Sequence, residues 1–174
     1  MPDGLFFFFE GPDDARFVDA IVVPVALGRY KWTGKYEYAC KRTRRICTCL
    51  SGLQNIPADY VFLTDMNASP CVSHRRVQIV ERYPAVVEER VIVAAAEIEA
   101  WYLAGIDVRS ASQLGMEPLE RTDHITKEGF DRLIPPSFES RIDFMSEILK
   151  RYSLDTARQN NRSFDYLMSR LLGT

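Results

Sequence analysis

Residues Leu5 to Phe17 read LFFFFEGPDDARF, and this stretch decides the predicted fold. An uninterrupted apolar run of this length, flanked by turn residues, is typical of a strand that is buried on both faces. Gly11 permits the tight turn that follows, and Pro12 suits the first turn of a helix. Glu10 therefore stands at the carboxyl end of a buried strand, which is where open α/β sheets bind their ligands.

Two more apolar segments also end in acids. Residues 59–64 (DYVFLT) precede Asp65, and residues 90–96 (RVIVAAA) precede Glu97. Helical patterns separate the three strands, which implies parallel strands joined by right-handed crossovers. Because the carboxyl ends of parallel strands share one edge of the sheet, we expect the acids that follow these strands, including Glu10, to lie close together.

The remaining patterns complete an α/β prediction. Residues 36–39 are a candidate short strand. We therefore expect a mostly parallel sheet of about four strands with helices on both faces. Pro24 limits the first helix, so its last turn should be kinked or broken. The helices expected between the strands cover residues 13–27, 41–53 and 73–83, and one more begins near residue 97 and stops at Gly105.

From residue 107 onward strand patterns disappear and helical patterns take over. We divide the chain into an α/β domain, residues 1–106, and a helical C-terminal extension, residues 107–174, packed on the same domain. The helices expected in the extension cover residues 127–134, 139–152 and 163–172.

The net charge and the lengths of the apolar runs limit the classes of protein to which this chain can belong. The 174 residues carry a net charge of -2, so the whole molecule has no electrostatic preference for nucleic acid, although a local basic patch can still bind a phosphate backbone. No apolar run approaches the roughly 20 residues that a membrane-spanning helix needs. The N-terminus lacks the basic start of a signal peptide, so we expect a cytoplasmic protein with reduced cysteines.

Clustered carboxylates repel one another unless a cation neutralises them. Asp and Glu oxygens suit a hard divalent ion, Mg²⁺ or Mn²⁺, which commonly serves phosphoryl chemistry. The pattern is consistent with metal-assisted phosphodiester hydrolysis or with binding of a phosphorylated ligand. Acids after strands are also frequent helix caps, and for Asp13, Asp14 and Asp65 this explanation stays open.

Several short motifs resemble one family. FFFFEGPDDARF resembles the first Toprim motif, a Glu-Gly turn after the first strand, and Asp65-Met66-Asn67 resembles its Asp-x-Asp motif. VAAAEIEAWYLAG is similar to the Glu-x-Glu-x-Trp signature of small Toprim-like proteins related to the nuclease domain of overcoming-lysogenization-defect proteins. NNRSFDYLMSRLL is similar to the end of such chains. Each motif is short, but their order, spacing and strand context together are moderately specific.

The resemblance implies roles for particular residues. It makes Glu10 the general acid or base and Asp65 a Mg²⁺ ligand. Asn67 departs from the family pattern, because an amide oxygen brings no charge to a metal site. The residues that the resemblance places on the metal side are Asp14, Asp65, Asn67, Glu97 and Glu99.

Two main functions remain open at this point. The first is a Mg²⁺-dependent nuclease or related phosphoryl-transfer enzyme acting on DNA or RNA, with a partner ATPase as an open question. The alternative is a non-catalytic Toprim-like binding module whose metal site is degraded, as Asn67 suggests. A third candidate is a sensor of small nucleotides.

Other polar residues are assigned more ordinary roles. The spacing of the four cysteines does not match a zinc site, and His74 is expected at the surface. Trp101 and Tyr102 are expected in the core of an amphipathic helix rather than stacked on a base. The basic residues Lys41, Arg42, Arg44, Arg45, Arg75 and Arg76 form either a solvated face or a guide for a phosphate backbone.

Overall fold

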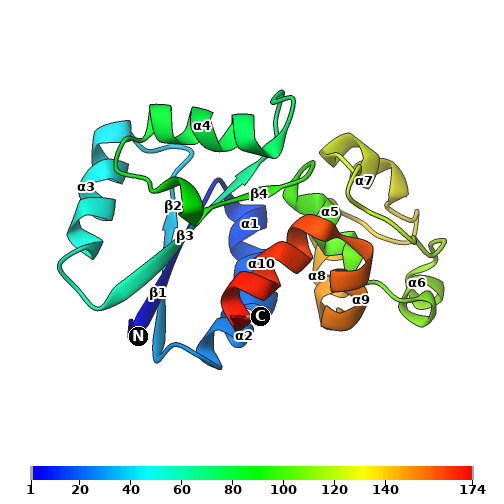
Figure 1. Cartoon of the computed structure of the whole chain (residues 1–174). Coiled ribbons are helices and arrows are strands. Elements are labelled where there is room, and N and C mark those ends of the chain that lie inside the picture. The colour runs from blue at the N-terminus through cyan, green and yellow to red at the C-terminus, as the bar shows by residue number, and fades with distance from the viewer. Residues whose placement is uncertain (1, 174) are drawn as a thin grey trace. The chain divides into compact units, whose positions relative to one another are not determined.

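Four parallel strands form one sheet in the order β2-β1-β3-β4 (Figure 1). The strands are β1 (Gly4–Phe9), β2 (Trp32–Glu37), β3 (Ala58–Asp65) and β4 (Val91–Ala94). The predicted α/β class, with a mostly parallel sheet of about four strands flanked by helices, is confirmed.

The computed structural model describes residues 2–173, and the chain divides into two units, Met1–Val93 and Ala94–Thr174. The first unit contains β1, β2, β3 and most of β4. The second unit is helical. The predicted division after residue 106, with the extension packed on the α/β domain, stays a prediction.

Aromatic side chains fill one face of the sheet in the first unit. Phe8 of β1 lies in register with Tyr36 of β2 and Phe62 of β3, at ring-centroid distances of 5.3 and 5.8 Å. Helices α3 (Thr43–Leu53) and α4 (Val72–Arg82) cover this face and contribute buried side chains to the same core. The predicted helices at 41–53 and 73–83 are therefore confirmed within two residues at each end.

The opposite face of β1 buries Leu5, Phe7 and Phe9, because successive side chains of a strand point to opposite faces. The chain that follows is helical from α1 (Pro12–Phe17) through a π-helical segment (Val18–Val22) to α2 (Val23–Leu27). Pro24 has no N–H to donate and crowds the preceding turn, and the π-helical segment directly precedes it. The irregularity predicted for the last turn thus lies one turn earlier.

Strand β2 corrects the sequence prediction, which placed a short strand at residues 36–39 and a loop before it. The strand instead covers Trp32–Glu37 at the edge of the sheet. Its residues are exposed or half-buried, so it lacks the apolar run of a central strand. Gly34 lies opposite Phe6, and a Cβ atom at residue 34 would lie only 2.3 Å from the Phe6 ring.

The second unit contains six helices among its described residues, and aromatic rings contact one another between them. The helices are α5 (Ile98–Ala104), α6 (Val108–Leu114), α7 (Lys127–Leu133), α8 (Arg141–Lys150), α9 (Leu154–Asn160) and α10 (Arg162–Leu172). Helices α6 and α9 were not predicted, and each has only seven residues. Trp101 and Tyr102 are buried in this unit, as expected.

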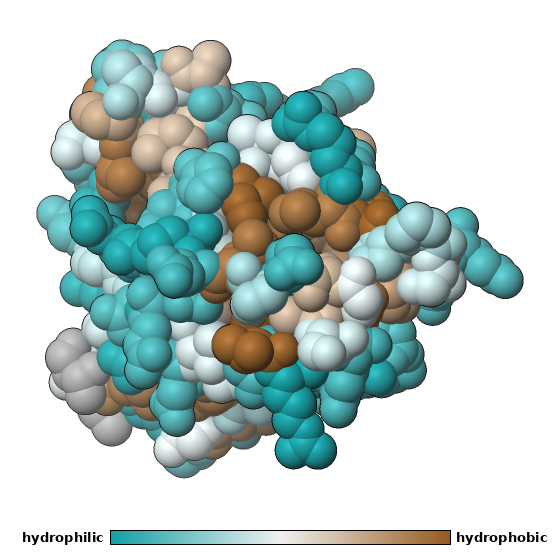
Figure 2. Space-filling view, turned by 90° about the vertical axis from the view of Figure 1, so that its right-hand side faces the viewer, coloured by the Kyte–Doolittle hydropathy of each residue, from teal (hydrophilic) through white to brown (hydrophobic). Residues whose placement is uncertain are grey.

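Hydrophilic residues cover much of the face drawn in Figure 2, as charged side chains are seldom fully buried. Within residues 2–173, no helix has the length and apolar character needed to cross a membrane.

Candidate functional site

Glu10 and Asp65 lie at the same edge of the sheet. Glu10 directly follows β1, and Asp65 is the last residue of β3, the parallel neighbour of β1. The sequence places acids here because apolar strand residues end at the sheet edge, where polar side chains meet solvent. The two acids whose approach was inferred from topology are thus on adjacent strand ends of the first unit.

One oxygen of Glu10 gathers three contacts from elsewhere in the fold. Thr64 Oγ1 lies 3.0 Å from Glu10 Oε1, Tyr38 Oη lies at 3.2 Å, and Arg75 Nη2 lies at 3.5 Å. The Glu10 side chain is 30% exposed. Within the described residues its other oxygen, Oε2, has no hydrogen-bond partner. The carboxylate is therefore oriented through one oxygen, while the side chain as a whole is partly exposed.

Arg75 on α4 connects these groups. Its Nε donates to the backbone carbonyl of Asp65 at 2.8 Å, and its Nη2 donates to Thr64 Oγ1 at 2.6 Å. The Arg75 side chain is only 14% exposed. The fixed fork of a guanidinium suits this bridging role, because it presents several donors in one plane.

The buried side chain of Tyr38 also contacts Glu10. Its hydroxyl lies 2.8 Å from the carbonyl of Leu63 and 3.2 Å from Glu10 Oε1, yet a phenol has a single hydrogen to donate. Burial, reinforced by the negative charge of Glu10, raises the pKa of Tyr38 well above its ordinary value. Tyr38 is therefore a neutral phenol at physiological pH.

Asp14 and Asn67, two of the predicted metal-side residues, have structural contacts in the first unit. The Asp14 carboxylate is buried and accepts a hydrogen bond from the N–H of Gly11 at 3.1 Å, so it caps the start of α1. Asn67 is exposed and has a φ of 50°, a left-handed conformation that Asn tolerates well. Its side-chain amide contacts the carbonyl of Asp65 at 3.4 Å.

Glu97 and Glu99 lie in the second unit, where each has a protein partner. Glu97 accepts a hydrogen bond from the N–H of Lys127, the first residue of α7. Glu99 is 5% exposed and forms an ion pair with Arg141, which also pairs with Asp131. Their predicted role as metal ligands stays a prediction, and these contacts give both residues a structural role as well.

Known proteins resemble this chain in structure but not in sequence. No protein-family model and no curated protein matches the chain in sequence. The C-terminal region of the Burkholderia pseudomallei OLD protein has a similar structure, with 16% identity and a TM-score of 0.48; the match covers 98% of this chain and 99% of that one. The C-terminal region of the Xanthomonas campestris pv. campestris OLD protein matches with 12% identity and a TM-score of 0.42, covering 99% and 97% of the two chains.

The chain resembles that region of the OLD proteins. At these identities the likeness concerns the fold alone, so the roles of individual residues rest on their own geometry.

The acids do not form a ready-made cage for a cation. In the part of the chain that the structure describes, no three His, Cys, Asp or Glu side chains are grouped closely enough to hold a metal ion. Mg²⁺ does not require such a cage, because it usually keeps several waters and binds one or two carboxylates together with substrate phosphates. Asp65 and Asn67 carry oxygen atoms of the kind that such a hydrated ion binds.

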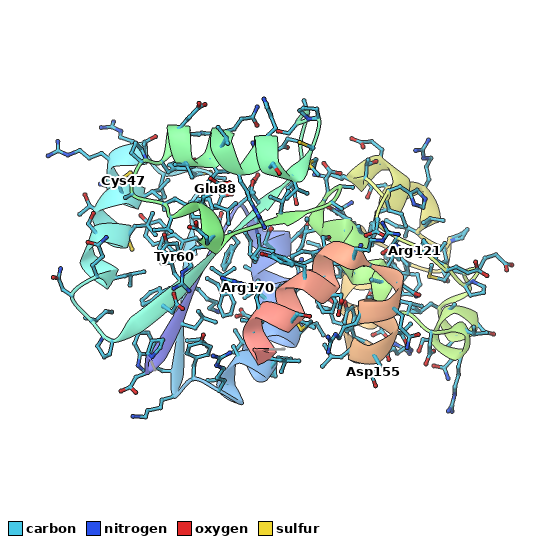
Figure 3. The ribbon with its side chains drawn as sticks, in the orientation of Figure 1. Cys47, Tyr60, Glu88, Arg121, Asp155 and Arg170 are labelled. Carbon is cyan, nitrogen blue, oxygen red and sulfur yellow. The ribbon has the colours of Figure 1, made fainter. Side chains whose placement is uncertain are left out.

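The four cysteines are free, and Cys47 lies half-buried on α3 (Figure 3). His74 is exposed. Sequence reasoning missed the contacts that Tyr38, Thr64 and Arg75 make with Glu10, and no motif or spacing signals them.

Proposed function

We propose that this chain is a Mg²⁺- or Mn²⁺-dependent nuclease, or a related phosphoryl-transfer enzyme, that acts on nucleic acid. The observation that carries the proposal is the Glu10 carboxylate at the carboxyl edge of a parallel sheet, held through Oε1 on a side chain that is 30% exposed. Ligand sites of open α/β sheets lie at this edge.

Glu10 acts as the general acid or base. Contacts from Thr64 and Arg75 fix Oε1, so the carboxylate loses little orientational freedom when substrate binds. A proton is taken up or released at Oε2, the oxygen without a partner among residues 2–173. Positioned proton transfer of this kind typically accelerates a reaction by about 10²- to 10⁴-fold.

The metal would be held by oxygen atoms of Asp65 and Asn67, completed by waters and substrate. When bound, it would supply Lewis-acid polarisation of a phosphate oxygen. Arg75 adds a fixed positive charge beside Glu10, which reduces the repulsion between the acidic edge and an approaching phosphate.

The test is plasmid nicking by the full chain in Mg²⁺ or Mn²⁺, with labelled RNA as a parallel substrate. We expect Glu10→Gln to slow cleavage about 100-fold or more. Glu37→Gln is the matched control: Glu37 is an exposed acid at the end of the neighbouring strand β2, and its loss should leave the rate unchanged.

Two outcomes would overturn the proposal. Equal rates for wild type and Glu10→Gln would remove Glu10 from the chemistry. Absence of cleavage by wild type, with a melting temperature unaffected by millimolar metal, would favour the non-catalytic binding module, since a ligand of the folded state must raise that temperature.

A further inference from the structure

A strongly basic surface lies at the start of α3 in the first unit. Its members, which we call the α3 basic surface, are Lys41, Arg42, Arg44 and Arg45. All four side chains are exposed, and within residues 2–173 none of them has an ion-pair or hydrogen-bond partner. Four uncompensated positive charges in five positions form a local field that the net charge of -2 conceals.

The surface is hollowed rather than flat. One hollow of about 490 Å³ is lined by Tyr36, Arg42, Arg44, Arg45, Thr48 and Cys49. A second of about 350 Å³ is lined by Cys40, Lys41, Arg42 and Arg45. Arg42 and Arg45 line both hollows, so their guanidinium groups can contact groups bound in either one.

The placement of these charges is unfavourable for the helix itself. The first turn of α3 contains no acid, and Arg42 at the N-cap position provides no side-chain capping bond. Positive side chains at a helix N-terminus oppose the helix dipole. Residues that break a local rule of stability without a compensating contact are found mainly at functional sites.

The loop before α3 fixes this surface beside Glu10. The N–H of Tyr38 donates to the Phe9 carbonyl at 2.9 Å, and the N–H of Ala39 lies 3.3 Å from the Glu10 carbonyl. Lys41 then donates its N–H to the carbonyl of Tyr38 at 2.9 Å. The basic residues therefore begin at the same edge of the sheet that carries Glu10.

We propose that the α3 basic surface binds the sugar-phosphate backbone of a nucleic acid and leads it to Glu10. Phosphates carry the complementary charge at regular spacing, and contacts from Arg and Lys to phosphate position a strand without reading its sequence. The part of this proposal that concerns delivery to Glu10 depends on the proposed nuclease function, whereas the binding itself does not.

The experiment measures fluorescence anisotropy of a short fluorescein-labelled DNA duplex, and of the same sequence as RNA, with the full chain in EDTA. We expect Arg42→Ala/Arg45→Ala to weaken binding roughly tenfold or more at 0.1 M salt and to reduce the slope of log K against log salt by about 2. The control is Arg109→Ala/Arg162→Ala, which removes the same charge from exposed positions in the second unit and should bind like wild type.

Thermal unfolding of the same variants separates binding from folding. Because the dipole conflict is relieved, Arg42→Ala/Arg45→Ala should melt at the same temperature as wild type or higher, so weaker binding cannot come from a damaged fold. If both double variants weaken DNA binding equally, the affinity depends only on the net charge of the chain, and the proposal is overturned.

The remaining outcomes are also decisive. Unchanged affinity and salt slope in Arg42→Ala/Arg45→Ala would overturn the proposal. The same holds if this variant binds DNA and RNA like wild type and loses binding only to vesicles of anionic lipid. If Glu10→Gln binds DNA normally and wild type does not cleave it, the proposed nuclease function fails while this inference stands. If Arg42→Ala/Arg45→Ala cleaves with unchanged KM, the inference fails while the nuclease stands.

Discussion

Nη2 of Arg75 lies 3.5 Å from Oε1 of Glu10, although 65 residues separate them in sequence. The same guanidinium binds Thr64 and the backbone carbonyl of Asp65. Helix α4 is thereby linked to the ends of β1 and β3 through one side chain. The orientation of the Glu10 side chain therefore depends on Arg75 as well as on strand β1.

Replacing Arg75 tests that dependence. Arg75→Lys keeps the charge but not the planar fork, so we expect it to lower the nicking rate roughly tenfold, because small displacements of a reacting group are costly. Arg75→Met should in addition lower the free energy of unfolding by about 1–3 kcal/mol, measured by urea denaturation. Arg82→Met on the same helix is the control. If Arg82→Met nicks as slowly as Arg75→Lys, the rate depends on the helix as a whole and not on the contact between Arg75 and Glu10.

Asn67→Asp adds the carboxylate that the Toprim pattern has at this position. Asp tolerates the φ of 50° about as well as Asn, so the backbone should not change. We expect Mg²⁺ to raise the melting temperature of Asn67→Asp more than that of wild type, by the equivalent of about 1 kcal/mol for a fivefold tighter site. Asn67→Gly keeps the backbone but has no donor and should respond less than wild type. Identical metal responses for Asp and Gly would place the ion elsewhere.

Tyr38→Phe probes the buried phenol. Near neutral pH the loss should cost about 1–3 kcal/mol of unfolding free energy, because the Leu63 carbonyl loses its donor. Tyr38 has a raised pKa in the folded state, so above the ordinary value of 10.0 the unfolded chain loses a proton that the folded chain retains. The contribution of Tyr38 is therefore complete below that value and is lost as pH rises. Urea titrations between about pH 8 and pH 11 should show the difference between wild type and Tyr38→Phe shrinking at the alkaline end; a constant difference would mean that folding does not raise this pKa.

Glu99→Gln distinguishes a structural acid from a metal ligand. Glu99 is buried against Arg141, so its neutralisation should destabilise the chain by about 3 kcal/mol even in EDTA. A residue whose only role was ligation would leave the metal-free protein equally stable, or more stable through relief of repulsion. Arg141→Met and the double variant complete a cycle that measures the coupling between the two side chains.

The central strands could be predicted because burial on both faces imposes long apolar runs, as in β1 and β3. Strand β2 was misplaced because it is only partly buried, unlike the other edge strand, β4, and because WTGKYE contains Gly and Lys that suit a loop equally well. The two missed helices, α6 and α9, are short, and each begins with a side-chain cap: Asp107 and Ser153 accept hydrogen bonds from the N–H groups of Ser110 and Thr156.

The site was predicted in part for similar reasons. Parallel topology alone brings Glu10 and Asp65 to one edge, and a sequence reveals topology through its alternation of strands and helices. The partners of Glu10 depend instead on side-chain packing: Tyr38 and Thr64 lie 28 and 54 residues away, and no local pattern specifies such pairs.

The Phe6 ring over Gly34 has a consequence for the alignment of strand β2. A shift of β2 by one position would bring Thr33 or Lys35 opposite that ring and turn every β2 side chain to the wrong face. A shift by two would set Trp32 or Tyr36 against it. Gly34 accommodates the ring without a clash, so any other alignment of β2 would have to displace Phe6, and the edge strand reaches Tyr38 in the observed register.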